Sequence, residues 1–185
     1  MQRLPQNPVV SPRTGVLVGM IAFAVAVRLL IHFVPGALPC NFTPVEAIAL
    51  FGGAYFTDRR LAFLVPLAAM FLADLVIGLH ALIPLIYACI AASVVLGFGL
   101  RNRVSVARVA GFGIGSALLF FVVVSFVEWM MGDTSYCRAG IVSCYAAAVP
   151  FLKNQVAGTL VWSAILFGGF ELMRRRWEVL GSATA

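Results

Sequence analysis

Charged residues are scarce in this sequence. Only 11% of its 185 residues are Asp, Glu, Lys or Arg, and Lys153 is the single lysine. Soluble globular domains carry ~25% charged and ~45–50% apolar residues, whereas this chain is 62% hydrophobic with a mean hydropathy of +1.02. The composition therefore excludes an ordinary soluble domain and indicates a polytopic membrane protein.

Enzyme signatures are missing as well. The sequence contains no Walker A motif, no G-x-S-x-G and no H-E-x-x-H, so it has no ATP site of its own and no recognisable hydrolase site. The four cysteines lack the paired C-x₂-C spacing of zinc sites. We therefore expect no enzyme activity, no cofactor and no metal. The net charge of +6 comes from basic residues between apolar segments, which indicates membrane topology rather than nucleic-acid binding.

Six apolar segments predict six transmembrane helices in an all-α membrane domain over residues 15–176. The segments cover residues 15–34, 44–57, 61–79, 81–100, 107–131 and 155–173. A loop of mixed polarity is predicted at 132–154, a disordered cytoplasmic tail at 1–14 and a second cytoplasmic tail at 177–185. The first segment is longer than the ~7–15 apolar residues of a signal peptide, so a retained helix is favoured.

The arginines predict the orientation in the cell (inner) membrane. Six spans would place ten of the thirteen basic residues on one side, which the positive-inside rule assigns to the cytoplasm together with both termini. These ten are Arg3, Arg13, Arg59, Arg60, Arg101, Arg103, Arg108, Arg174, Arg175 and Arg176.

The second segment is too short to span the membrane alone. Fourteen helical residues rise ~21 Å, against a hydrocarbon core of ~30 Å. If Arg59 and Arg60 hold its inner end at the cytoplasmic face, residues 35–43 must dip into the membrane to meet its outer end. Irregular backbone at that depth needs a covering of protein or a water-filled cavity. The length predicts an outward-facing cavity capped by this loop.

Polar side chains gather in the outer half of the predicted bundle, where ionisable residues are costly and usually functional. Each has a structural alternative: Arg28 could snorkel or pair with Asp74, and Trp129 could belong to an interfacial aromatic belt. The clustering on one side favours a binding site over a continuous pore. The candidate contacts are Arg28, Asp74, His80, Tyr87, Glu128, Trp129, Lys153 and Asn154.

The stretch from Thr43 to Glu46 has the pattern of a capping box, with Thr at the N-cap, Pro at the first helical position and Glu at the third. Glu46 would then reach back to the Thr43 N–H, and direct ligand contact by Glu46 is the alternative. A helix that begins below the membrane surface would place Asn41 and Phe42 at cavity depth, with Asn41 the better candidate for contact.

Two further features concern pairing and docking. Cys137 and Cys144 are the natural disulfide pair in an oxidising outer compartment, with Cys40 as a competing partner. Small residues at Gly15, Gly19, Ala22 and Ala26 give the first segment a face that suits close helix packing. That face would pack inside the bundle or dock another membrane subunit.

The segment from Asn41 to Phe56, NFTPVEAIALFGGAYF, resembles the signature of a bacterial family of transport proteins. Looser matches are Ala73–His80 (ADLVIGLH), Cys144-Tyr145 and Pro150–Asn154 (PFLKN). That family is similar to the substrate-binding S components of energy-coupling-factor (ECF) vitamin transporters. S components are six-helix membrane proteins that bind a vitamin or metal from outside, and most depend on a transmembrane coupling subunit and two ATPases.

The resemblance implies uptake of a small molecule, such as a vitamin or related micronutrient with cobalamin among the candidates, from the outward-facing cavity. It also implies docking of an ECF-type coupling subunit on the small-residue face of the first helix. Two other hypotheses stay open. One is a solitary proton- or ion-coupled carrier that uses Asp74, and the other is an intramembrane enzyme or assembly factor that uses Asp74 and His80.

Overall fold

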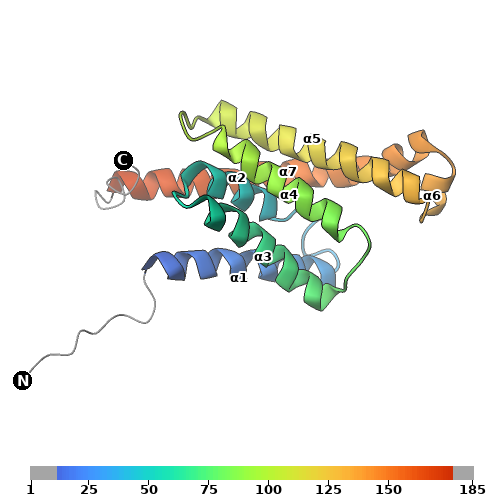
Figure 1. The fold of residues 1–185 in the computed structure, drawn as a ribbon, viewed down its shortest axis with the longest axis horizontal. Helices are drawn as coiled ribbons and strands as arrows, with labels where there is room; N and C mark the ends of the chain where they lie inside the picture. The colour runs from blue at the N-terminus through green and yellow to red at the C-terminus, as the bar shows by residue number, and fades with distance from the viewer. Residues whose placement is uncertain (1–11, 177–185) are drawn as a thin grey trace, which may run out of the picture.

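The computed structural model describes residues 12–176, and all regular structure in that range is helical. The predicted tails lie mostly outside it, at residues 1–11 and 177–185. Figure 1 shows the helices running roughly side by side. They are α1 Pro12–Phe33, α2 Val45–Tyr55, α3 Arg59–Ile77, α4 Ile83–Phe98, α5 Val106–Met131, α6 Ser135–Arg138 and α7 Ile141–Arg176.

Within residues 12–176, four helices are long and apolar enough to cross a membrane: α1, α3, α5 and α7. The apolar helices α2 and α4 are shorter, with 11 and 16 residues. At 1.5 Å per residue they rise ~16 and ~24 Å, less than the ~30 Å hydrocarbon core. The all-α membrane class is therefore supported with four candidate spans.

The predicted loop at 132–154 is wrong over most of its length. Gly132 and Gly140 adopt φ values of 64° and 134° and bracket the single turn of α6. From Ile141 the chain is helical without interruption, and Pro150 lies inside α7. Three consecutive alanines at 146–148 favour this helix, and a membrane helix tolerates an internal proline. The mixed polarity of residues 141–154 therefore reflects the different faces of a helix rather than a loop.

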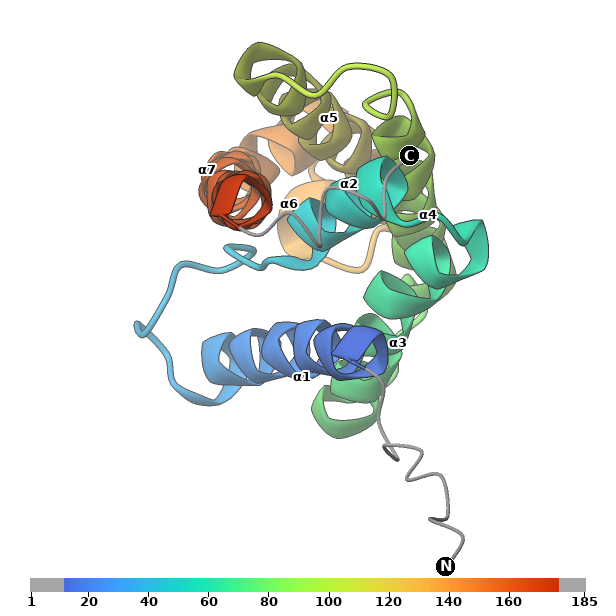
Figure 2. The ribbon, with the colours of Figure 1, turned by 90° about the vertical axis from the view of Figure 1, so that its left-hand side faces the viewer.

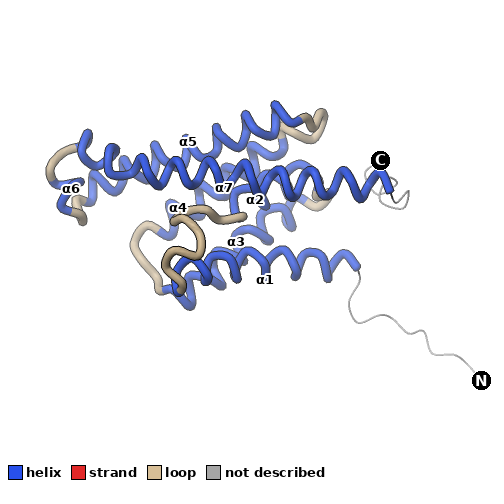
Figure 3. The backbone as a smooth tube through the Cα atoms, turned by 180° about the vertical axis from the view of Figure 1, so that it is seen from behind, coloured by secondary structure: helices blue, strands red, loops and turns tan. Residues whose placement is uncertain are grey.

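The connections that carry most of the arginines gather at one end of the molecule. In Figure 1 the start of α1, the α2–α3 turn, the α4–α5 turn and the end of α7 all lie on the left. At this end Arg101 donates hydrogen bonds to the carbonyls of Gly53 and Phe56, each at 2.7 Å, and so satisfies the C-terminal carbonyls of α2. The opposite end carries α6 and the α1–α2 and α3–α4 connections. Figure 3 draws the loops of these connections in tan.

Helix α2 is the centre of the bundle. All ten residues from Val45 to Ala54 are buried, as expected for a helix that is apolar all round. It contacts α3, α4, α5 and α7, and Figure 2 shows it in the middle of these neighbours. Its contact with α4 is very close: a Cβ added at Gly53 would lie 2.4 Å from the Val94 carbonyl oxygen, and one at Gly97 would lie 2.5 Å from that of Leu50. Glycine at both positions lets the two backbones touch.

Candidate functional site

The carboxylate of Glu46 lies in the interior, where only 4% of the residue is exposed. Its Oε1 accepts a hydrogen bond from Gln155 Nε2 at 2.9 Å and its Oε2 accepts one from Thr159 Oγ1 at 2.8 Å. Ser116 Oγ lies 3.3 Å from Oε1. Glu46 therefore joins α2 to α5 and α7 through neutral partners, and no ion pair within residues 12–176 involves it.

A chain of hydroxyl groups leads away from Glu46 toward α4. Ser116 Oγ lies 2.6 Å from Ser93 Oγ, and Ser93 Oγ donates to the carbonyl oxygen of Cys89 at 3.0 Å. Both serines are buried. Buried polar groups carry a cost unless they are hydrogen-bonded, so these contacts make a continuous polar path from α2 through α5 to α4.

A second polar cluster joins α1, α3 and α4. Arg28 forms a 2.6 Å ion pair with Asp74 Oδ1, and the hydroxyl of Tyr87 donates to Asp74 Oδ2 at 2.9 Å. The Arg28 side chain is 19% exposed and that of Asp74 is 3% exposed. Arg28 Nε is buried and has no hydrogen-bond partner. Both oxygens of Asp74 are thus occupied, while the guanidinium keeps free donors.

A cavity of about 240 Å³ brings the two clusters together. Arg28 and Glu46 both line it, along with His80 from the α3–α4 connection. The lining residues come from all six long helices and from two connections: Arg28, Asn41, Thr43, Val45, Glu46, Met70, His80, Ile86, Ile90, Phe120, Gln155 and Thr159. The cavity therefore combines a few polar groups with apolar walls, as small-molecule sites do.

The loop before α2 packs directly on α7. A Cβ added at Gly158 would lie 2.9 Å from the Cα of Phe42, and Trp162 Nε1 donates to the Phe42 carbonyl at 3.3 Å. Asn41 adopts a positive φ of 64°, a conformation that asparagine tolerates better than most residues. Glycine at 158 thus lets the loop approach α7, which positions Asn41 and Thr43 along the cavity.

The capping-box prediction is wrong. Helix α2 begins at Val45 with Pro44 at the N-cap, and no side chain caps it. The Glu46 carboxylate points to Gln155, Thr159 and Ser116 instead of the Thr43 N–H. Two strong interior donors and a nearby hydroxyl outweigh one local hydrogen bond. Ligand contact by Glu46, the alternative from the sequence, gains support because Glu46 lines the cavity.

The structure gathers part of the predicted set. Arg28, Asn41 and His80 line the cavity, while Asp74 pairs with Arg28 and accepts a hydrogen bond from Tyr87. The others lie away from the cavity lining. Of these, the Phe42 ring packs near Trp162, Trp129 packs near Phe126, and Lys153 is exposed. The set outside the lining is Phe42, Glu128, Trp129, Lys153 and Asn154.

Sequence reasoning missed Gln155, Thr159 and Ser116. A signal for the first two was available: Gln155, Thr159 and Ser163 are polar residues at four-residue spacing within an apolar segment. That spacing places them on one face of a helix. Ser163 is also buried, and its hydroxyl has no partner.

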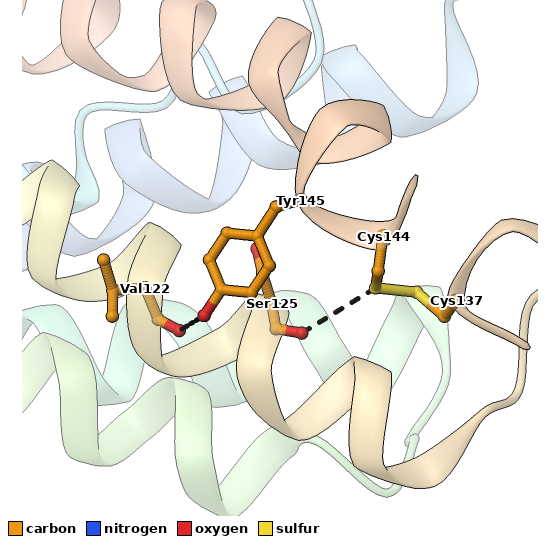
Figure 4. Close-up of a disulfide and its surroundings, with 5 residues drawn as sticks. All are labelled: Val122, Ser125, Cys137, Cys144 and Tyr145. Atoms are coloured by element: carbon orange, nitrogen blue, oxygen red, sulfur yellow. Dashed lines mark hydrogen bonds between the residues drawn. A yellow bond between two sulfur atoms is a disulfide. The ribbon is translucent and has the colours of Figure 1, made fainter. Parts of the chain in front are cut away.

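The start of α7 is fixed to α5 near the predicted disulfide. Cys137 and Cys144 are joined, which agrees with the first of the two expected pairings, and Cys40 is a free, exposed thiol. Figure 4 shows Cys144 Sγ facing the Ser125 carbonyl oxygen at 3.8 Å and the Tyr145 hydroxyl donating to the Val122 carbonyl at 2.8 Å. A disulfide sulfur has no proton, so the Cys144–Ser125 approach is a contact rather than a hydrogen bond.

Gly15, Gly19, Ala22 and Ala26 are exposed on α1, and a Cβ added at Gly19 would meet no atom within 4 Å. The small-residue face therefore does not pack inside the bundle. No group of three His, Cys, Asp or Glu side chains that could hold a metal ion occurs within the described part of the chain.

Comparison with protein families gives one match. The model of a family of unknown function, DUF6580, matches residues 9–180. The chain belongs to DUF6580. That match covers every helix described above, including the whole Glu46 cavity, so the site lies within the part of the chain that defines DUF6580. Comparison with curated proteins and with solved structures finds no match to this DUF6580 chain.

Proposed function

We propose that this DUF6580 chain is an integral membrane protein that binds a small molecule in the Glu46 cavity as a step in its uptake, in the manner of an ECF S component. One observation carries the proposal. Glu46 is a buried carboxylate at the wall of a cavity, and its hydrogen-bond partners in the described part of the chain are all neutral. Burying a carboxylate beside a cavity is costly and is usually functional.

The other half of the bundle favours a binding pocket over a pore. One to three turns along α2 from Glu46, the rings of Phe51, Tyr55, Phe167 and Phe170 pack together with centroids 4.4 to 5.6 Å apart. Leu50 and Leu100 are fully buried beside them. This apolar plug separates the cavity from the arginine-rich end, so release on that side needs a rearrangement of the helices.

The size of the cavity favours a small substrate. Sites for drug-sized ligands measure ~300–1,000 Å³, and this cavity measures about 240 Å³. Cobalamin, one of the expected candidates, is far larger than such a space. We therefore favour a small micronutrient.

The exposed face of α1 supports the docking of a second membrane protein. Gly15, Gly19, Ala22 and Ala26 leave a flat strip on which a partner helix could pack closely. Under this proposal the partner is an ECF-type coupling subunit whose ATPases supply the energy. The arginine-rich end then faces the cytoplasm and the cavity opens outward.

The test is to purify the protein in mild detergent and identify co-purifying small molecules by mass spectrometry. We expect a ligand with the wild type, loss of that ligand in Glu46→Gln, and retention in the matched control Glu128→Gln, which changes a carboxylate outside the cavity lining. Absence of any ligand, together with no thermal stabilisation across a panel of vitamins, would contradict the proposal.

A second candidate is a proton-coupled carrier that works alone, with Glu46 in place of Asp74. Asp74 is already bound to Arg28 and Tyr87. By contrast, Ser116 donates to Glu46, and Ser93 lies between Ser116 and the carbonyl oxygen of Cys89. This chain of hydroxyl groups is a path along which a proton can reach Glu46.

This second candidate is tested by uptake into vesicles that contain the purified protein and no ATPase. We expect uptake to stop when a protonophore removes the proton gradient, and the Glu46→Gln variant to be inactive. Uptake that requires an ATPase and ignores the protonophore would leave only the first proposal. No hydrogen bond links Asp74 to His80 among residues 12–176, and no observation favours catalysis by that pair.

A further inference from the structure

The cavity separates two ionisable side chains that do not pair with each other. Glu46 is held by partners on α5 and α7, and Arg28 is held by Asp74 on α3, which also accepts a hydrogen bond from Tyr87 on α4. No hydrogen bond or ion pair connects the two clusters in the part of the chain that the structure describes. Both side chains nevertheless line the same space. The cavity therefore has an acidic wall and a basic wall.

Each wall keeps unused capacity for a ligand. A carboxylate can accept about four hydrogen bonds, and Glu46 has three partners, all neutral. A guanidinium has five N–H donors, and among residues 12–176 Arg28 donates one hydrogen bond, to Asp74. Glu46 thus suits a protonated amine, and Arg28 suits a carboxylate or another acceptor.

The positions of these walls are fixed rather than adaptable. Asp74 accepts hydrogen bonds from both Arg28 and Tyr87, which fixes the carboxylate that orients the guanidinium. Gln155 and Thr159 lie one turn apart on α7 and each bond one oxygen of Glu46. The Glu46 carboxylate and the Arg28 guanidinium therefore keep a constant separation. A ligand that contacts both must match that separation in length.

The remaining surface limits the body of the ligand. Val45, Met70, Ile86, Ile90 and Phe120 supply apolar walls between the polar groups. The volume of about 240 Å³ corresponds to roughly eight water molecules at ~30 Å³ each. A short apolar chain or one small ring fits this space.

From these observations we infer that the Glu46 cavity selects a small bipolar ligand, with an amine end against Glu46 and an acidic end against Arg28. The inference rests on the proposed binding function and gives it a substrate class. His80 and Asn41 are exposed residues of the same lining and offer further polar contacts.

The experiment uses linear amino acids as rulers on the purified full-length protein. The probes are 3-aminopropionate, 4-aminobutyrate, 5-aminopentanoate and 6-aminohexanoate, with butylamine and butyrate as single-ended controls. We expect one chain length to raise the melting temperature at a concentration at least tenfold lower than either control. In the Glu46→Gln variant, that probe should raise the melting temperature only at the concentration that butyrate requires.

The basic wall needs a variant that still folds. Arg28→Gln alone leaves Asp74 buried without its cation, so Arg28→Gln combined with Asp74→Asn is the informative variant. We expect this double variant to bind the best bipolar probe no more tightly than it binds butylamine. Glu128→Gln is the control, and we expect it to bind all probes as the wild type does.

The outcomes separate this inference from the function on which it rests. Stabilisation by no probe at 50 mM, or equal stabilisation by a bipolar probe and a single-ended control, overturns the bipolar class. A co-purifying ligand without an acidic or basic end overturns the class and leaves the binding function standing. Absence of any co-purifying ligand and of any stabilising probe overturns both.

Discussion

At the scale of single residues, the buried oxygens of Glu46 divide their hydrogen bonds between two helices. Thr159 and Gln155 donate from α7, and Ser116 lies near from α5. Ser163, one turn after Thr159 on α7, is equally buried but has no partner. These two residues make a natural pair for measuring what a hydrogen bond to Glu46 contributes.

We predict that Thr159→Val lowers the free energy of unfolding by about 1–3 kcal/mol, because it removes a donor from a buried carboxyl group while keeping the side-chain shape. Ser163→Ala should change it by less than about 0.5 kcal/mol, since no hydrogen bond is lost. Thermal and denaturant unfolding in detergent measure both. Equal losses in the two variants would show that the Thr159 hydrogen bond has no special weight.

Asp74→Asn tests the other cluster. We expect a loss of about 2–3 kcal/mol in unfolding free energy, below the ~3–5 kcal/mol for a fully buried pair, because the Arg28 side chain is 19% exposed. Replacing both partners, with Arg28→Met and Asp74→Asn, should recover part of this loss by removing the unpaired cation. A double variant less stable than Asp74→Asn would contradict this reasoning. Unfolding in detergent provides the measurement.

At the scale of elements, the crossing of α2 and α4 fixes the position of Glu46. The backbones meet at Gly53 and Gly97, where no Cβ fits. On the opposite side of the site, Gly158 gives the loop before α2 its place on α7. Three glycines thus set the distances between the elements that form the cavity.

We predict that Gly53→Ala and Gly97→Ala each lower the free energy of unfolding by roughly 1–3 kcal/mol, because the added methyl group would overlap a backbone carbonyl. Gly111→Ala in α5 is the matched control, since its Cβ would meet nothing within 4 Å. The free energy of unfolding of this control should stay the same or rise by up to about 1 kcal/mol, because alanine favours a helix more than glycine does. A similar loss in the control would indicate a general intolerance of alanine.

The same elements show how far the sequence could predict the structure. The boundaries of α2, α3, α4 and α5 were predicted to within about two residues, because charged or turn residues interrupt the apolar runs there. The partners of Glu46 could not be predicted, since Ser116, Gln155 and Thr159 are 70, 109 and 113 residues away along the chain. A local cap explains Glu46 equally well until the packing of α5 and α7 is known.

At the scale of the whole molecule, the cysteines provide a probe of orientation. Cys40 is exposed in the α1–α2 connection, Cys89 is buried, and Cys137 and Cys144 are joined. The α4–α5 connection lies at the opposite end of the bundle, where Asn102 is exposed (Figure 1).

We predict that a membrane-impermeant maleimide labels Cys40 in intact cells and that Cys40→Ser abolishes this labelling. In the Cys40→Ser background, Asn102→Cys should be labelled only after the membrane is opened. Labelling of Asn102→Cys in intact cells would reverse the proposed orientation.

The central place of α2 also has a consequence for how the chain is made. This helix leaves the ribosome before α7, yet two of the three side chains that contact Glu46 belong to α7. Until α7 is made, the nascent bundle therefore holds a carboxyl group without its main donors. A truncated chain keeps that defect permanently, and we expect cellular proteases to recognise it and remove it.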